Sequence, residues 1–134
     1  MISRRKVLAS AAIGVIGSVH HAFAKGAAPS PVERFDADHD GTVDLAEAKK
    51  AAADTFTKLD NDKDGTLDFK ELSGRLSRKE FAAADGDKDK TLDKDEYLIL
   101  VEQRFKAADA DGDGSVSAAE FGTPAGRALA RLLE

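Results

Sequence analysis

Apolar and acidic positions recur along this chain with a period of 24 or 25 residues. In each repeat, an aromatic or aliphatic residue precedes a polar segment of twelve residues, and this segment has an apolar residue at its eighth position. The segments begin at residues 36, 60, 85 and 109. Loops of this kind between helical stretches predict repeated helix–loop–helix units. The apolar residues at position eight are expected to join loops in pairs through short β-bridges; they are Val43, Leu67, Leu92 and Val116.

The connectors between the segments are 12, 13 and 12 residues long, which limits how the loops can pair. Twelve residues form a single helix of about 18 Å, so residues 48–59 and 97–108 are each expected to be one helix with a loop at either end. The middle connector contains Gly74 and a Ser-x-x-Glu capping box at Ser77 and Glu80. It predicts two short helices with a break near Ser77. The fold class is therefore an all-α, compact four-unit helical bundle, in which loops 2 and 3 pair and loops 1 and 4 pair.

Capping signals define the two ends of this bundle. Ser30 and Glu33 form a second capping box with Pro31 at the first helical position, which predicts a very short first helix. Thr123-Pro124 predicts a final helix with an apolar stripe that packs on the bundle. The expected core consists of Phe56, Leu59, Phe69, Leu72, Leu76, Phe81, Leu98, Val101, Phe105, Leu129 and Leu132.

Each twelve-residue segment has the ligand spacing of a calcium-type loop. We name residues 36–47 loop 1, 60–71 loop 2, 85–96 loop 3 and 109–120 loop 4. Such ions take six to eight oxygens at about 2.3–2.6 Å, supplied by positions one, three, five, seven, nine and twelve. Position seven contributes a backbone carbonyl, position nine acts directly or through water, and the glutamate at position twelve gives two oxygens. The predicted metal ligands are Asp36, Asp38, Asp40, Thr42, Asp44 and Glu47; Asp60, Asp62, Asp64, Thr66, Asp68 and Glu71; Asp85, Asp87, Asp89, Thr91, Asp93 and Glu96; and Asp109, Asp111, Asp113, Ser115, Ser117 and Glu120.

Position six of such a loop turns sharply with a positive φ, which favours glycine. Gly41, Gly65 and Gly114 fit this requirement, whereas Lys90 stands at the same position of loop 3. A non-glycine residue in that conformation costs about 1–2 kcal/mol. Loop 3 is therefore expected to bind more weakly than its carboxylates alone would predict.

The first 24 residues differ in composition from the rest. A basic start at residues 4–6 precedes an apolar run over residues 7–19, and Ala22-Phe23-Ala24 matches a signal-peptidase site. This order predicts a cleaved export signal over residues 1–24, and a single metal-binding domain over residues 25–134 in the periplasm. The paired Arg4 and Arg5 also match a twin-arginine signal, and both export routes stay open.

Charge and residue types narrow the functional classes. After cleavage, 17 basic side chains face 25 acidic ones, which argues against nucleic acid and against an anionic membrane as partners. The chain has no cysteine, so thiolate sites and disulfides are excluded. Nineteen of the 25 carboxylates are accounted for as ligands, and none is set apart as a general acid or base. We therefore expect a metal-binding protein that is not an enzyme.

With its loops, connectors and tail considered together, the chain resembles the lanmodulin family of periplasmic EF-hand proteins. The resemblance rests on the four loops at this spacing, on residues 64–75, on residues 97–108, and on residues 123–129. It implies binding of lanthanide(III) ions in preference to calcium. Proline at position two of the loops, a mark of that family, is replaced here by Ala37, Asn61, Gly86 and Ala110.

Two functions remain open from the sequence. The first is capture or buffering of calcium, lanthanide ions or both, with up to four ions per chain and folding on binding. The second is a calcium-dependent adaptor or docking module for a protein partner, whose identity the sequence does not give. Adaptors of this kind use methionine-rich surfaces, and Met1 is the sole methionine of the chain. The sequence therefore favours the first function.

Overall fold

The computed structural model describes residues 28–134. The predicted export signal lies outside these residues. The elements follow in the order α1 (Pro31–Phe35), β1 (Thr42–Asp44), α2 (Leu45–Leu59), β2 (Thr66–Leu67), α3 (Arg78–Ala84), β3 (Leu92–Asp93), α4 (Lys94–Ala108), β4 (Ser115–Ser117), α5 (Ala118–Phe121) and α6 (Pro124–Leu133). The predicted all-α bundle with little strand is confirmed.

The two long helices α2 and α4 are the predicted connectors between loops. Each begins three residues earlier than expected, because the residue at position nine of the preceding loop is its N-cap. The carboxylate of Asp44 accepts from the N–H of Glu47, and that of Asp93 accepts from the N–H of Glu96, both at 2.8 Å. The last residues of loops 1 and 3 are therefore already the first turn of a helix.

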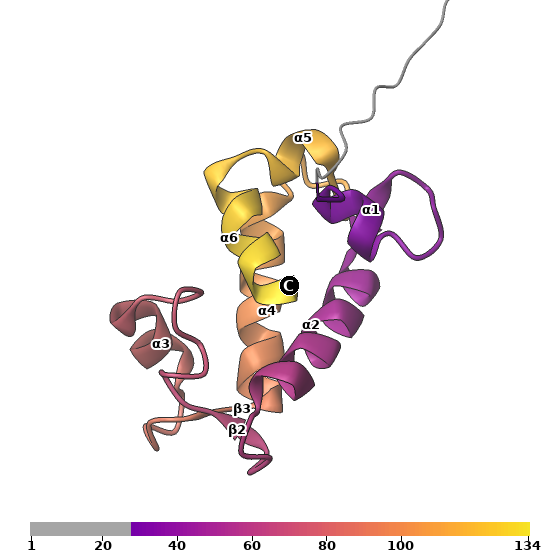
Figure 1. Cartoon of the computed structure of the whole chain (residues 1–134). Helices are drawn as coiled ribbons and strands as arrows, with labels where there is room; N and C mark the ends of the chain where they lie inside the picture. Colours follow the sequence, from indigo (N-terminus) through magenta and orange to yellow (C-terminus); the bar gives the residue numbers. More distant parts are fainter. Residues whose placement is uncertain (1–27) are drawn as a thin grey trace, which may run out of the picture.

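The predicted pairing of the loops is confirmed. Strands β1 and β4 are antiparallel with Val43 opposite Val116, which joins loops 1 and 4. Strands β2 and β3 are antiparallel with Leu67 opposite Leu92, which joins loops 2 and 3. Figure 1 shows β2 and β3 at one end of the molecule and α1 and α5 at the other, with α2 and α4 running between the ends.

The middle connector differs from the prediction at its first half. Residues 69–75 form successive turns rather than a helix, with hydrogen bonds from Ser73 N to Lys70 O and from Arg75 N to Leu72 O. Gly74 has a φ of +84°, which a continuous helix does not accommodate. The second half is correct, since Ser77 caps α3 through the predicted box with Glu80. The chain therefore reverses through a run of turns and one short helix.

The capping signals at both ends are confirmed as well. Ser30 and Glu33 form the box that starts α1, and Thr123 accepts from the N–H of Gly126 to start α6. Helix α6 packs against α4, α5 and α2, and its end lies between α2 and α4 (Figure 1). Gly126 allows α6 to approach the α5 turn, because a Cβ there would lie 2.0 Å from the carbonyl oxygen of Glu120.

The core is formed by the inner faces of these helices together with the four apolar residues of the strands. Eight of the eleven predicted core residues are buried, and Leu59, Phe69 and Leu98 are partly buried. Tyr97, which the prediction left out, is fully buried, and this burial raises the pKa of its hydroxyl. In residues 28–134, no helix combines the length and apolar character needed to cross a membrane.

Candidate metal centres

Each loop is folded around the carboxylate at its first position. In loop 1, Asp36 accepts from the N–H of Asp40 at 3.1 Å and from the N–H of Gly41 at 2.8 Å. The same two bonds recur in the other loops, on Asp60, Asp85 and Asp109. Because one side chain fixes the N–H groups of positions five and six, it sets the sharp turn that brings the acidic residues together.

Positions three and five continue the same pattern. The Asp38 carboxylate accepts from the N–H of Asp40 at 3.2 Å. The Asp40 carboxylate in turn accepts from both the N–H and the hydroxyl of Thr42, at 2.9 Å each. Threonine or serine at position seven repeats this double contact in every loop. The hydroxyl was not anticipated, although its recurrence at one position was a visible signal.

The turns gather carboxylates into four groups, one in each loop. Within each group, one oxygen from every member lies within 4.8 Å of the others. The groups are Asp36, Asp38 and Asp40; Asp60, Asp62 and Glu71; Asp85, Asp87 and Glu96; and Asp109, Asp111, Asp113 and Glu120. All donors are hard oxygens in a concave loop, which fits a calcium-type cation. The predicted ligands at positions seven and nine and at Glu47, Asp64 and Asp89 lie outside these groups. Ion binding by any of the predicted ligands stays a prediction.

The glutamate at position twelve is held by the backbone on both of its oxygens. In loop 1, Glu47 Oε1 accepts from the N–H of Ala37 at 2.7 Å, and Oε2 accepts from the N–H of Asp44 at 2.9 Å. Loops 2 and 3 repeat both bonds on Glu71 and Glu96. The carboxylate is therefore oriented by residues two and nine of its own loop, and in loop 1 this holds Glu47 outside the group of Asp36, Asp38 and Asp40.

The side chains at position nine act as helix N-caps here, a role that was not predicted for them. Asp44, Asp68, Asp93 and Ser117 each accept from the N–H of the glutamate three residues later. The Asp-x-x-Glu and Ser-x-x-Glu spacing was a readable capping-box signal. A cap uses one carboxylate oxygen, and the aspartates keep a second oxygen for a direct or water-mediated contact with an ion.

Backbone strain occurs at two positions of the loops. Lys90 has a φ of +71°, as expected for position six of loop 3. His39, Lys63 and Lys88 at position four also have a positive φ, near +60°, and this was not predicted. Loop 3 therefore contains two strained lysines, whereas loop 4 has Gly112 and Gly114 at the same positions.

The crowded carboxylates shift each other's protonation. Partial desolvation in loop 2, followed by the neighbouring carboxylates, raises the pKa of Asp62. Hydrogen bonds from the N–H and then the hydroxyl of Thr66 lower the pKa of Asp64. The pKa of the carboxylate at position three is raised in the other loops as well, at Asp38, Asp87 and Asp111. Each loop therefore has one carboxylate whose charge is unfavourable until a cation is close.

Paired acidic loops between helices define a metal-binding protein. A family model described as EF hand matches residues 33–50, 52–77 and 100–123, which together make up half of the chain. The chain belongs to this family. The matched segments contain loops 1, 2 and 4, and loop 3, with its two strained lysines, falls between them. No curated protein matches the chain.

Proposed function

We propose that the chain is an exported, periplasmic protein that captures or buffers hard cations, binds trivalent lanthanides in preference to calcium, and folds on binding. Up to four ions bind per chain, one in each loop, through the predicted ligands. Binding rather than catalysis is its function. The observation that supports this proposal is an acidic cluster in each of the four loops, with the same two backbone hydrogen bonds to the first aspartate of every loop.

The charge of the loops favours a trivalent ion. Loops 1 to 3 each have five carboxylates at ligand positions, and loop 4 has four. Because Coulomb attraction scales with the charge of the ion, each carboxylate adds more to the binding of a lanthanide than of calcium. The resemblance to the lanmodulin family points the same way.

The coupling to folding follows from repulsion between these carboxylates. Two like charges 4 Å apart repel by about 4 kcal/mol at an effective dielectric near 20. The core that opposes this repulsion is small, and Ala48, Ala52, Ala108 and Ala130 are among its buried residues. A cation removes the repulsion, so the free energy of binding appears as stability of the fold.

The deciding experiment is a titration of the mature protein, after removal of ions by a chelator, with calcium and separately with lanthanum. Helix content is followed by circular dichroism. We expect the folding midpoint for lanthanum at a free concentration at least about tenfold lower, or about 1.4 kcal/mol. Glu47→Gln and Glu71→Gln are the matched variants, and each is expected to weaken one strong site. Equal midpoints would refute the lanthanide preference and leave a calcium-binding protein. A fully folded chelator-treated protein would refute folding on binding.

Export is tested separately. Mass spectrometry of the protein from a periplasmic fraction should give a mature chain that begins at Lys25. A chain that keeps residues 1–24 would instead be anchored.

The adaptor function predicts a different response. A calcium-dependent adaptor exposes an apolar groove, so calcium should increase the binding of an apolar fluorescent dye. In residues 28–134, the one large apolar side chain with high exposure is Ile99 on α4. We expect no increase in dye binding with either ion.

A further inference from the structure

The end of α6 is held by side chains from three other parts of the chain. A helix leaves its last four carbonyl groups without partners inside the helix. Here the Tyr97 hydroxyl donates to Leu132 O at 2.6 Å, and the Thr55 hydroxyl donates to Leu133 O at 2.8 Å. The Arg75 guanidinium donates to Glu134 O at 2.9 Å. We name this set of three contacts the α6 clasp.

The donors of the α6 clasp lie close in sequence to different metal loops. Tyr97 directly follows Glu96, the last residue of loop 3, and Arg75 lies four residues after Glu71, the last residue of loop 2. Thr55 lies in α2, which connects loop 1 to loop 2. Helix α6 itself follows loop 4 through the close contact of α5 and α6. Short stretches of chain therefore connect each of the four loops to the end of α6.

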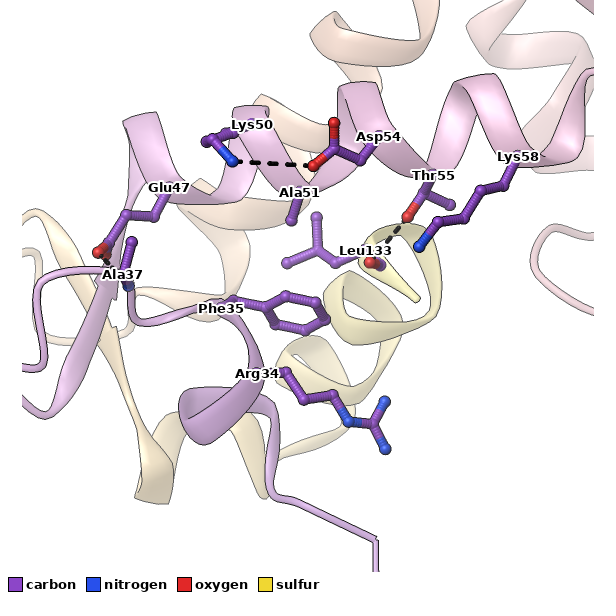
Figure 2. A pocket seen from close by; sticks show the side chains of 10 residues that line it. All are labelled: Arg34, Phe35, Ala37, Glu47, Lys50, Ala51, Asp54, Thr55, Lys58 and Leu133. Carbon is purple, nitrogen blue, oxygen red and sulfur yellow. Dashed lines mark hydrogen bonds and ion pairs between the residues drawn. The ribbon is translucent and has the colours of Figure 1, made fainter.

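Two of the three contacts are buried. Tyr97 is 0% exposed and Thr55 is 2% exposed. Figure 2 shows the Thr55 hydroxyl joined to Leu133 beside a hollow of about 220 Å³ that Arg34 and Phe35 also line. Arg34, two residues before loop 1, also forms an ion pair with the Glu134 side chain at 3.0 Å. Because buried carbonyls lose more than exposed ones when a donor is removed, Tyr97 and Thr55 are the main contacts.

The α6 clasp connects elements that belong to two separate pairs of loops. The β1–β4 ladder couples loops 1 and 4, and the β2–β3 ladder couples loops 2 and 3. The two ladders are at opposite ends of α2 and α4 (Figure 1). Helices α2 and α4 each join a loop of one pair to a loop of the other, and they pack against one another. The end of α6 contacts both helices and the middle connector.

We propose that Tyr97, Thr55 and Arg75 are positioning residues that couple the loop 1/loop 4 pair to the loop 2/loop 3 pair through the end of α6. Ion binding in one pair orders the helices that carry these donors, so the clasp forms and the other pair binds more tightly. By linkage, the effect is the same in both directions. The proposal rests on metal binding by the loops, whichever ion they hold.

The experiment compares Thr55→Val with Thr57→Val. Both are on α2, but the Thr57 hydroxyl is exposed and donates to Ala53 O within the same helix. Each variant, with Tyr97→Phe as a second clasp variant, is titrated with calcium alone and with lanthanum alone. Helix content and the number of bound ions are both measured. We expect the single folding transition of the parent to divide into two steps in Thr55→Val and Tyr97→Phe, with the second midpoint about fivefold higher, or about 1 kcal/mol.

The number of bound ions should be unchanged in both clasp variants, and Thr57→Val should behave as the parent. A shift in midpoint without a change in steepness would mean that the clasp only stabilises the fold, and would overturn the proposal. Equal effects in Thr55→Val and Thr57→Val would do the same. If the parent itself binds no ion, the proposed function fails, whereas a parent that binds in two steps refutes the clasp alone. Urea unfolding of the fully loaded variants identifies a variant that cannot fold, and in that case Arg75→Met takes its place.

Discussion

Loops 3 and 4 stand at the two ends of α4 and have the same backbone with different side chains. Position six is Lys90 in loop 3 and Gly114 in loop 4, yet both have a positive φ, +71° and +87°. Their N–H groups donate to the first aspartate of the loop at nearly equal distances, 2.8 Å and 2.9 Å. The loop conformation is therefore imposed by the repeated carboxylate–backbone contacts, and glycine lowers the cost of that conformation without determining it.

The two loops also differ at position nine and in the helix to which each is joined at its end. Asp93 and Ser117 both cap the next helix, but Ser117 has no carboxylate for an ion. Loop 3 leads into the fifteen residues of α4, whereas loop 4 leads into the four residues of α5 and then α6. Loop 3 thus combines more charge with more strain, and loop 4 has less of both and depends on α6 for support.

The largest expected effect comes from Gly126→Ala, which removes the support of loop 4. The added Cβ would lie 2.0 Å from Glu120 O and 2.5 Å from Phe121 Cα, so α6 must move away from α5. Overpacking against backbone of this kind costs about 3 kcal/mol. We expect lower thermal stability of the ion-loaded protein and loss of one bound ion. Gly122→Ala is the control, because its nearest backbone contact is 3.2 Å.

A reciprocal exchange at position six tests the strain directly. Lys90→Gly should tighten loop 3, and Gly114→Lys should weaken loop 4, each by about 1–2 kcal/mol. A Cβ at Gly114 meets no heavy atom within 4 Å, so the first side-chain carbon adds no clash to the strain of the positive φ. Site-specific affinities from the amide signals of positions six in an NMR titration measure both changes. An unchanged or lower affinity in Lys90→Gly would show that loop 3 avoids a positive φ in solution.

An exchange at position nine tests the effect of charge. Ser117→Asp adds a carboxylate to loop 4 and keeps the cap on α5, so lanthanum should gain more than calcium at that site. The expected gain for lanthanum relative to calcium is about threefold, or about 0.7 kcal/mol. Competition between lanthanum and calcium, followed by the NMR amide signal of Gly114, measures the ratio of the two affinities. Asp93→Ser should lower the ratio at loop 3, and a gain that is equal for both ions would contradict the charge argument.

The smallest effect concerns the protein after removal of ions. Desolvation, followed by neighbouring carboxylates, raises the pKa of Asp87 above its ordinary value of 3.8. A group whose pKa is raised in the folded protein stabilises the fold at pH values below its ordinary pKa. This stabilisation is lost as the pH rises through the pKa that the group has in the fold. Asp87→Asn should therefore stabilise the chelator-treated protein at neutral pH, and the difference should vanish in acid below pH 3.8. Urea unfolding at both pH values measures this, and calcium affinity of loop 3 should fall in the same variant.

Local signals predicted most of this structure. The twelve-residue repeats predicted the loops, the connector lengths predicted α2 and α4, and the capping boxes at Ser30 and Ser77 predicted the starts of α1 and α3. Loop pairing followed because a connector of one helix cannot bring its own two loops together. These features depend on residues close in sequence, where propensity and spacing decide the outcome.

The features that were missed depend on contacts between distant residues or on a competing local role. The hydroxyl of Thr55 bonds a carbonyl 78 residues away, and no periodicity indicates such a pair. The turns over residues 69–75 replace a predicted helix because the chain must reverse between paired loops 2 and 3. Position nine was assigned to the metal alone, although the same spacing also predicts an N-cap.

Tyr97 gives the protein an optical reporter of its own. It is the sole tyrosine, the chain has no tryptophan, and it directly follows the last residue of loop 3. Ultraviolet light at wavelengths longer than those that phenylalanine absorbs is therefore absorbed by this one ring. The ring is fixed in the core by the hydrogen bond of its hydroxyl to Leu132 O. Because Tyr97 directly follows Glu96, we expect a luminescent terbium ion held in loop 3 to receive that energy, so its green emission should follow the filling of this loop without any attached dye.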